Sequence, residues 1–447
     1  MDMTEGKPLR LMIRFSLPLL LVNVLQMLFS VIDGAILGRL LGVNAFASVG
    51  ATLSLYWMAF SAIFGMMCGF GVLFAQRFGA KDPVLLRASL ATGSVLSAAL
   101  SVIVILTGVF GCRPVLELIG TPPELIDGAV LYLRVFFFGA PIIFANNLFG
   151  TMLRSMGDSK TPMRSIILAT VLNIGLDFAL IIPFGIGGVS AATLLAQLAG
   201  GAYCFLALRK TGYLKGEGFG WDIPTAKELM RLGLPLSFRN AVIELGGVIV
   251  QRYTNSFGET FIAGIAAAKR MYNLLLIIAN GVEAAVATFV AQNFGAGKLD
   301  RVKKGVNGGL QLMFISTVVA MAITLPFGRQ ILGLMVSGDA AQVAAVLDAG
   351  ARQLMLMTLG LPLLNLLFLY RASLEGIGNS FIPMISGFLE LATRIVVVIV
   401  LVPVWDKWGV YLTDPLGWVP ATLLLTVSYV IVFRRKLSKT LAGTDAP

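Results

Sequence analysis

The sequence predicts an all-α, polytopic membrane protein with twelve transmembrane helices, and its composition and its apolar runs carry this prediction. The chain has 447 residues, of which 57% are hydrophobic and 13% charged, and its mean hydropathy is +0.88. Such a composition is far too apolar for a soluble protein of this length. The apolar runs are long enough for helices of ~20 residues each, and no segment between them is long enough for a separate soluble domain.

Twelve apolar segments predict the individual membrane spans. The expected spans are approximately 11–37, 48–74, 88–110, 129–152, 163–183, 187–208, 232–255, 261–290, 305–326, 347–370, 384–404 and 416–434. The first run begins near Arg10 and lacks a small-residue cleavage site of the usual form. It is therefore expected to be a retained helix and not a cleaved signal peptide.

The formal net charge of +11 is spread along the chain and does not form a nucleic-acid-binding patch. Lysine and arginine residues cluster at alternate ends of successive spans, as at Arg10 and Arg14 before the first span and Arg434 and Arg435 after the last. By the positive-inside rule these ends face the cytoplasm. We expect a multi-pass protein of the cell (plasma or inner) membrane, with both termini cytoplasmic and no nucleic-acid partner.

Residue types that carry enzyme and metal chemistry are scarce. The chain has no histidine, and Cys68, Cys112 and Cys204 show neither paired spacing nor a metal-ligand pattern. A disulfide scaffold and a histidine-ligated metal site are therefore not expected. A phosphate-binding, glycine-rich lysine loop is also absent from the sequence, so ATP is not the expected energy source. We predict that the protein is not an enzyme, has no catalytic residues and needs no cofactor.

Three sequence blocks recur in the second half of the chain, in the same order. AQRFGA at 75–80 returns as AQNFGA at 291–296, an offset of 216 residues; Leu17-Pro18 returns as Leu234-Pro235 at 217; and LxxxGxSxxP at 153–162 returns at 374–383, an offset of 221. Because each half holds six spans, an even number, the halves have the same orientation and are related by an axis along the membrane normal.

The repeat divides the chain into two pseudo-symmetric lobes of six helices. The N-terminal lobe comprises 1–209, a cytoplasmic inter-lobe linker rich in glycine comprises 210–227, and the C-terminal lobe comprises 228–447. Secondary transporters use this plan because two repeats can rock about a shared site near the membrane midplane. Duplication alone, as in a channel or a structural bundle, also produces such a repeat.

Carboxylates inside the spans of the first lobe are the strongest functional signal, because ionised groups are costly there and usually face a cavity, a partner or a pathway. Asp33, Asp177 and Thr193 all lie roughly 6–9 Å below the outer ends of their expected helices, at ~1.5 Å per residue. Asn173 precedes Asp177 by one turn and shares its helix face. These four residues can therefore share one pocket.

The oxygen-rich set Asp33, Asn173, Asp177 and Thr193 predicts a cation-coupling site. Carboxylate, amide and hydroxyl oxygens suit a hard monovalent cation such as Na⁺, and neighbouring carboxylates can also share a proton. The sequence does not decide between Na⁺ and H⁺, and it predicts no other metal site. A structural hydrogen bond of Asp177, and a kink cap or an arginine partner for Asp33, remain alternatives.

The second lobe breaks the symmetry, because Val250 and Val398 stand at the repeat positions of Asp33 and Asp177. A different set of charged residues lies within its spans. The predicted second-lobe polar network comprises Glu244, Glu283, Glu390 and Arg394. The last two are spaced four residues apart with the acid first, which favours an ion pair on one helix. A structural salt-bridge network and a substrate-facing or second coupling site are both compatible with this set.

Pro18 lies fifteen residues before Asp33 in the same expected helix. Its missing N–H permits a bend, so Pro18 is a candidate hinge that couples occupancy of the Asp33 site to the shape of a central cleft. Proline is also common in membrane helices for packing reasons alone.

Several stretches resemble the multidrug and toxic-compound extrusion (MATE) transporters, in family order and over nearly the whole chain. They are PLLLVNVLQMLFSVID at 18–33, GRLLG at 38–42, LRSMGDSKTP at 153–162, LNIGLD at 172–177 and SFGETFIAGIAA at 256–267. The resemblance implies two six-helix bundles arranged as a V, rocker-switch alternating access, and export of hydrophobic, often cationic, organic compounds in exchange for Na⁺ or H⁺. It also places the family's first-lobe cation site on Asp33, Asn173, Asp177 and Thr193.

The expected function is therefore multidrug efflux by antiport. The expected partners are small organic substrates and the lipid bilayer, and the protein is expected to be a monomer. A flippase for lipid-linked substrates is the nearest alternative, and it would be favoured by a cleft lined with many arginines. A channel would predict flux without counter-ion coupling, and a membrane enzyme would need a catalytic set that the sequence lacks.

Overall fold

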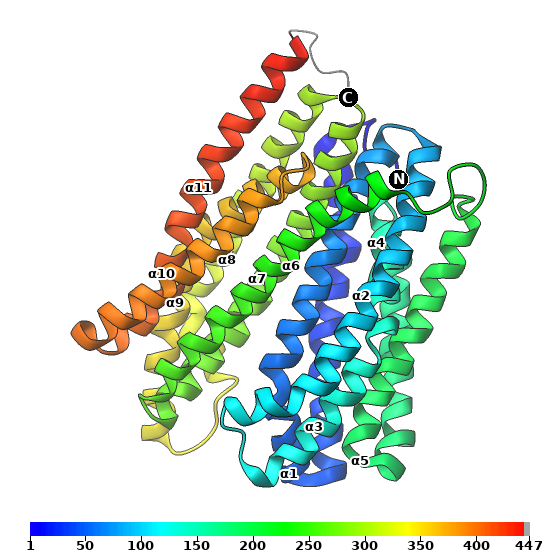
Figure 1. The fold of residues 1–447 in the computed structure, drawn as a ribbon. Helices are drawn as coiled ribbons and strands as arrows, with labels where there is room; N and C mark the ends of the chain where they lie inside the picture. The colour runs from blue at the N-terminus through cyan, green and yellow to red at the C-terminus, as the bar shows by residue number, and fades with distance from the viewer. Residues whose placement is uncertain (442–447) are drawn as a thin grey trace. The chain divides into compact units, whose positions relative to one another are not determined.

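The computed structural model describes residues 1–441, and Figure 1 shows that these residues are arranged as long α-helices. The helices are α1 (Pro8–Gly79), α2 (Pro83–Leu118), α3 (Pro123–Phe138), α4 (Ala140–Ser155), α5 (Lys160–Lys210), α6 (Ile223–Asn255), α7 (Glu259–Gly295), α8 (Leu299–Gly333), α9 (Ala340–Gly376), α10 (Phe381–Trp405) and α11 (Lys407–Leu441). These described residues contain no strand, so the predicted all-α fold class is confirmed. The last residues of the predicted C-terminal lobe, 442–447, lie outside the described part of the chain.

The number of membrane spans agrees with the prediction. Ten helical segments are long and apolar enough to cross a membrane, and α3 with α4 makes a further span that is bent by 50°. α5 counts once among the ten, although its backbone leaves the helical conformation at Gly185. The Ser165 hydroxyl on one arm of α5 donates a hydrogen bond to the Gly200 carbonyl on the other, so α5 is an antiparallel pair of spans. Residues 1–441 therefore hold twelve spans.

Local sequence explains where helices begin and reverse. Asp82 precedes α2, and its side chain accepts hydrogen bonds from the backbone N–H groups of Val84 and Leu85. Pro83 fills the first helical position, where its missing N–H costs nothing. α1 reverses at Gly42, with φ 80° and ψ −173°, a conformation that only glycine adopts without strain.

The backbone reversals repeat in the two halves at the offsets found in the sequence. Gly42 in α1 has φ 80° and ψ −173°, and Gly258 before α7, 216 residues later, has φ 84° and ψ 171°. Gly185 in α5 has φ 56° and ψ −134°, and Asp406 between α10 and α11, 221 residues later, has φ 54° and ψ −130°. Because both angles agree in each pair, the halves share one helical plan, as the predicted pseudo-symmetry requires.

The chain separates into two compact units, each of which contains one half of the repeat. Unit 1 comprises Met1–Met3 and Leu17–Ser237, and unit 2 comprises Thr4–Ser16 and the chain from Phe238 onward. The chain passes from one unit to the other between Met3 and Thr4, within α1 and within α6. The predicted linker 210–227 lies inside unit 1, and its role as an inter-lobe linker stays a prediction. The two crossing points inside helices lie within three residues of the proline in the repeated Leu-Pro pair, which is Pro18 in α1 and Pro235 in α6.

Each unit has a hydrophobic cluster around the reversals of its spans. The cluster in unit 1 contains Leu37, Val49, Cys112, Leu116, Ile126, Ala129, Val130, Tyr132, Leu133, Ile181 and Val189. The cluster in unit 2 contains Val250, Phe261, Ile265, Ala349, Val398, Val410 and Tyr411. Val398 is completely buried in the second cluster, so the position equivalent to Asp177 is part of an apolar core in the second half.

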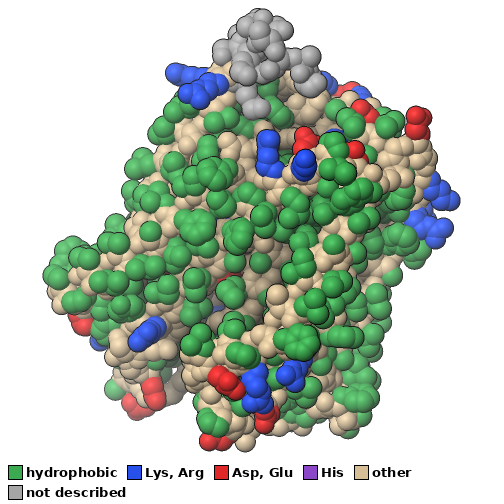
Figure 2. Space-filling view, viewed as in Figure 1, with side chains coloured by type: hydrophobic (Ala, Val, Ile, Leu, Met, Phe, Trp, Pro, Cys, Tyr) green, Lys and Arg blue, Asp and Glu red, His purple; other side chains and the backbone are tan. Residues whose placement is uncertain are grey.

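Large hydrophobic side chains are exposed along the helices, among them Leu17, Phe110, Phe178, Ile182 and Phe314, each more than half exposed. On the face shown in Figure 2, hydrophobic side chains cover the middle, and most of the visible Lys, Arg, Asp and Glu side chains lie toward the upper and lower ends. An exposed apolar surface of this extent suits a bilayer and not water. The chain is a multi-pass membrane protein.

Candidate functional site

Asp33 and Asp177 come together in unit 1, from α1 and from the first arm of α5. Their carboxyl groups lie within hydrogen-bonding reach of each other. The Asn173 amide, one turn before Asp177, donates a hydrogen bond to Asp177 Oδ1 at 3.5 Å. Asn173 and Asp177 are 1% and 0% exposed. Three of the four residues predicted for the cation site are therefore neighbours.

The two carboxyl groups have no cationic partner among the residues that the structure describes. Among the ion pairs of residues 1–441, none includes Asp33 or Asp177. One oxygen of each carboxyl group, Asp33 Oδ1 and Asp177 Oδ2, is buried without a hydrogen-bond partner. Leaving a buried polar atom unsatisfied costs about 1–3 kcal/mol, and more for a charged group. A proton or a bound cation would satisfy both oxygens.

Two tyrosines stand beside the carboxyl groups, and neither was predicted. Tyr132 is within electrostatic range of Asp33 and Asp177, and Tyr56 is within range of Asp33. Their ring centroids are 6.3 Å apart, and Tyr56 also packs on Phe136 at 4.5 Å. These tyrosines thus place aromatic surface near the carboxyl groups, and apolar surroundings strengthen electrostatic interactions.

Thr193 lies on the second arm of α5 and is 9% exposed. Its hydroxyl donates a hydrogen bond to the carbonyl of Val189, one turn earlier, at 3.2 Å. The contact that the structure gives for Thr193 is thus within its own helix, and its oxygen keeps lone pairs for a further ligand. Its predicted place in the cation site stays a prediction.

The side chains of the first-lobe site could bind a cation only through oxygen atoms. Among residues 1–441 no group of three or more His, Cys, Asp or Glu side chains is placed to hold a metal ion. Two carboxyl groups and an amide are too few ligands for a divalent cation such as Ca²⁺, which takes 6–8 oxygens. The set does suit a proton or a weakly held monovalent cation that enters and leaves.

The second lobe contains a separate charged cluster around Arg394. Arg394 Nη2 contacts Glu390 Oε1 at 2.7 Å on the same helix, α10, and Asp414 Oδ1 at 3.2 Å on α11. The exposed fractions of these side chains are 11% for Arg394, 7% for Glu390 and 15% for Asp414. Glu244 on α6 is within electrostatic range of Arg394. Asp414 was not among the predicted members of the network.

Glu283 takes part in a different ion pair. Its carboxylate accepts a hydrogen bond from Arg371 Nε at 2.9 Å, and Arg371 also lies over the ring of Phe368 at 4.6 Å. Nearby, Arg239 pairs with Glu375, and both are buried. The four predicted residues of the second-lobe network therefore belong to two groups of contacts, one around Arg394 and one around Arg371.

Pro18 lies inside α1, and the non-helical residue that interrupts α1 is Gly42, well beyond it. Leu17, next to Pro18, is the first residue of the main segment of unit 1. The proline thus sits where the chain enters that unit, which is the place where a hinge would act. The predicted hinge role remains a prediction.

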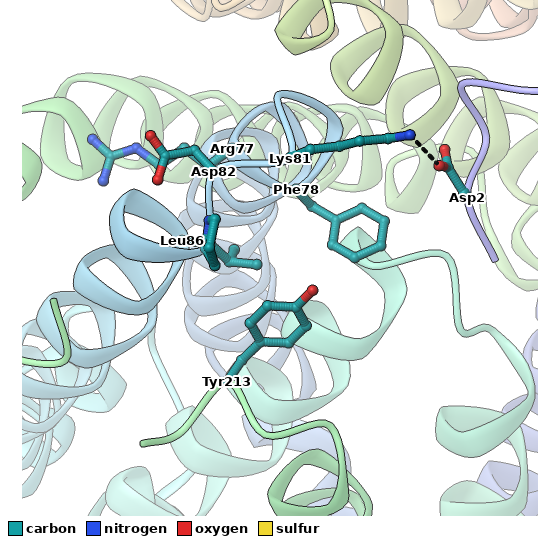
Figure 3. A pocket seen from close by; sticks show the side chains of 8 residues that line it. Asp2, Arg77, Phe78, Lys81, Asp82, Leu86 and Tyr213 are labelled. Atoms are coloured by element: carbon teal, nitrogen blue, oxygen red, sulfur yellow. Dashed lines mark ion pairs between the residues drawn. The ribbon is translucent and has the colours of Figure 1, made fainter. Parts of the chain in front are cut away.

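A small pocket of about 310 Å³ lies in unit 1 at the junction of α1 and α2. In Figure 3 the Lys81 side chain extends across the pocket to an ion pair with Asp2, and the Tyr213 ring faces Phe78. The Lys81–Asp2 distance is 3.8 Å, and the Tyr213 and Phe78 ring centroids are 6.4 Å apart. These contacts attach the start of the predicted linker to unit 1.

Twelve spans in two pseudo-symmetric halves, with a carboxyl pair inside one of them that has no cationic partner among the described residues, define a membrane protein of the transporter class. The family model described as MatE matches residues 18–179 and 235–400. The probable multidrug resistance protein YoeA of Bacillus subtilis is 31% identical to this chain over 345 residues, covering 73% of each protein. The probable multidrug resistance protein NorM of Thermotoga maritima is 27% identical over 394 residues, covering 86% of this chain and 83% of its own.

The fold has close matches among solved structures as well. A MATE crystal structure in the bent conformation superposes with a TM-score of 0.89 at 22% identity, covering 98% of both chains. The chain belongs to the MatE family, which consists of membrane transporters. The resemblance found in the sequence is confirmed.

Proposed function

We propose that this protein is a secondary active efflux transporter that exchanges small hydrophobic, often cationic, organic compounds for Na⁺ or H⁺. The observation that carries this proposal is the Asp33–Asp177 carboxyl pair in the membrane-spanning part of unit 1, where Asp177 is fully buried, Asp33 is partly exposed, and neither has a cationic partner among the described residues. Charged groups at this depth are rarely retained without a role in a pathway or a coupling site. The names of the relatives support efflux of drug-like compounds.

Exchange follows from the charge of the site. With both carboxyl groups ionised, the site attracts a cation; with a proton or Na⁺ bound, that attraction falls. Asp33, Asn173 and Asp177 would hold the coupling ion, with Thr193 as a further oxygen ligand. An ion that enters from outside therefore lowers the affinity for a cationic substrate, and the loss of affinity drives its release.

Alternating access requires the two halves to move as bodies, and the chain offers two places for this movement. α1 and α6 pass from one compact unit to the other beside Pro18 and Pro235. A proline in a helix removes one backbone hydrogen bond and permits a bend. We infer that Pro18 acts as a hinge and that ion binding at Asp33, on the same helix, is coupled to its bending.

The remaining features of the proposal follow from the sequence. The lysine and arginine distribution supports a cell-membrane protein with both termini in the cytoplasm. The protein would work as a monomer, and its energy source is the ion gradient without a bound cofactor. The flippase alternative is not favoured, because the relatives named above are multidrug resistance proteins.

The test uses purified protein in liposomes loaded with a fluorescent organic cation, with either a Na⁺ or an H⁺ gradient imposed. Wild type is compared with Asp33→Asn and Asp177→Asn. Asp127→Asn is the matched control, because Asp127 is also a first-lobe carboxylate but is exposed and paired with Arg113. We expect gradient-driven movement in wild type and in the control, and at least a tenfold loss in both site variants.

The gradient that drives movement identifies the coupling ion. Unchanged transport in Asp33→Asn and Asp177→Asn would contradict the proposed site. Movement that does not respond to either gradient would indicate a channel or flippase and would contradict the antiport mechanism itself.

A further inference from the structure

The Arg394 cluster occupies the second-lobe position that corresponds to the first-lobe cation site. The repeat offsets of 216 and 221, fixed by the backbone reversals, define the counterparts. They are Tyr56 with Tyr272, Asn173 with Arg394, Asp177 with Val398, and Thr193 with Asp414. An aromatic hydroxyl group thus stands beside the site in each half, while the polar residues on the reversing helices differ.

The charge of the second cluster equals that of a first-lobe site with one cation bound. Two ionised carboxyl groups at Asp33 and Asp177 carry two negative charges. Glu390 and Asp414 also carry two, and the Arg394 guanidinium between them contributes one positive charge at 2.7 and 3.2 Å. The chain itself therefore supplies a monovalent cation in the second lobe at the position where the first lobe supplies none.

The helices around Arg394 leave room for its guanidinium. A Cβ atom added at Gly246 on α6 would lie 3.1 Å from Arg394 Nη1, and one added at Gly417 on α11 would lie 3.2 Å from Arg394 Cγ. The first-lobe counterpart of Gly417 is Ala196, where no long side chain has to be accommodated. Space for the arginine is thus built from glycines on both neighbouring helices.

Two polar atoms at this cluster are buried without hydrogen-bond partners, which an ordinary structural salt bridge would not leave. They are Arg394 Nε and the Tyr272 hydroxyl, and Tyr272 is 5% exposed. Tyr272 lies within electrostatic range of Asp414, Arg394 and Glu390, and its ring stacks on Trp418 at 6.1 Å. Buried polar groups normally find partners, and the Tyr272 hydroxyl, which can accept a hydrogen bond, would remain available to a cation once the arginine side chain is removed.

We propose that Arg394 is a tethered counter-cation that fills the second-lobe counterpart of the cation site, so that ion exchange is confined to the first lobe. The proposal rests on the proposed function of Asp33 and Asp177, because it compares the Arg394 cluster with a first-lobe site that binds a cation. It also assigns a ligand class to the second site: once the arginine side chain is removed, Glu390 and Asp414 form a site for a small planar cation such as guanidinium.

The test measures cation binding through the melting temperature, without transport. The background is Asp33→Asn/Asp177→Asn, which removes the first site. In this background, guanidinium or Na⁺ is titrated at constant ionic strength into protein with Arg394 intact and into Arg394→Ala. A ligand that binds only folded protein raises its melting temperature with concentration. We expect no cation-specific rise with Arg394 intact and a rise of several degrees with guanidinium in Arg394→Ala.

The matched control removes the charges of the site altogether. In Glu390→Gln/Arg394→Ala/Asp414→Asn, in the same background, guanidinium should no longer raise the melting temperature. A folded Arg394→Ala protein that does not respond to guanidinium overturns the proposal. So does a Na⁺-dependent rise with Arg394 intact, which would show an exchangeable second-lobe site.

Arg394→Ala leaves two buried carboxylates and can fail to fold. Recovery of folded protein only when guanidinium is present throughout purification then supports the proposal. If none is recovered, the titration is carried out on Glu390→Gln/Arg394→Ala, which keeps Asp414 alone, and the absence of a rise there overturns the proposal. Because no step depends on transport, a failure of gradient-driven efflux remains distinguishable from a failure of this inference.

Discussion

In the first lobe Asp33 and Asp177 face each other without a cation from the chain, whereas in the second lobe Arg394 lies between Glu390 and Asp414. Both sites are carried by spans that reverse at matched residues, with nearly identical backbone angles. Duplication thus places a polar site at matched positions in the two lobes, while a few side chains decide whether the chain itself supplies a positive charge there. Removing the charge of Arg394 in the second lobe should therefore lower stability, whereas removing the charge of Asp177 in the first lobe should not.

The largest expected effect is on the second lobe. Arg394→Met should destabilise the protein by about 3–5 kcal/mol, because removing one partner of a buried ion pair leaves uncompensated charge. Asp177→Asn should leave stability unchanged or raise it, since the carboxylate has no cationic partner to lose. Thermal unfolding of both variants in the same detergent or nanodisc checks this, and equal losses in the two lobes would break the comparison.

The two crossing points that lie inside helices can be tested by proline replacement. Pro18→Ala and Pro235→Ala should slow transport without lowering the melting temperature, because alanine restores a backbone hydrogen bond and favours a helix interior by up to about 3 kcal/mol over proline. Pro326→Ala is the control, since Pro326 lies inside α8, away from the crossing points. Unchanged transport in both variants would remove the hinge from the mechanism.

Neighbouring glycines on α6 test the space around Arg394. Gly246→Ala should destabilise by about 1–3 kcal/mol, as in overpacked interiors, because Arg394 is held by two carboxylates and cannot move aside freely. Gly247→Ala meets nothing within 4 Å and should stabilise by up to about 1 kcal/mol through helix propensity. The sign difference in melting temperature is the measured outcome, and equal signs would show that the guanidinium is not confined.

The residue types at the two matched reversals, Gly185 and Asp406, can be exchanged for one another. Asp406 has φ 54°, a conformation that favours glycine, and its counterpart Gly185 has φ 56°. Asp406→Gly should stabilise and Gly185→Asp should destabilise, each by about 1–3 kcal/mol, the cost of a strained backbone residue. Thermal unfolding of the two single variants tests this. If Asp406→Gly is destabilising, the aspartate side chain must contribute a contact that outweighs the strain.

The smallest effects are expected where the two halves are alike. Arg113 pairs with Asp127 in the first half, and the counterpart residues Arg329 and Asp348 pair in the second. All four side chains are more than 40% exposed, and exposed ion pairs contribute only about 0–1 kcal/mol. Asp127→Asn and Asp348→Asn should lower the melting temperature slightly and by similar amounts. A large loss in one half alone would show that the outer ends are not equivalent.

Much of the architecture could be predicted because it depends on local patterns. Apolar runs gave the spans, and repeated motifs gave the two halves. Asp33 and Asp177 stood out because a carboxylate in an apolar run is costly wherever the helix packs. The proximity of Asp33 and Asp177 followed from depth alone, since Asp33 lies nine residues before the reversal at Gly42 and Asp177 eight residues before that at Gly185.

Other features depend on packing between distant segments and gave no local signal. Asp414 lies twenty residues after Arg394, and only the reversal at Asp406 brings the two together. Tyr56 lies in an aromatic stretch with Trp57 and Phe60 and gave no signal of its own, and its position near Asp33 depends on how the arms of α1 pack. The passage of the chain between the two compact units within α1 and α6 also gave no local signal, because both helices continue across it and composition does not change there.

The reversal at Gly185 also has a mechanical meaning. A single non-helical residue joins the two arms of α5, which are held together further along by the contact between Ser165 and Gly200. Because the connection is only one residue long, the arm that carries Asp177 cannot shift along its axis without moving the arm that carries Thr193. A displacement of one arm would therefore reach the far end of both spans together.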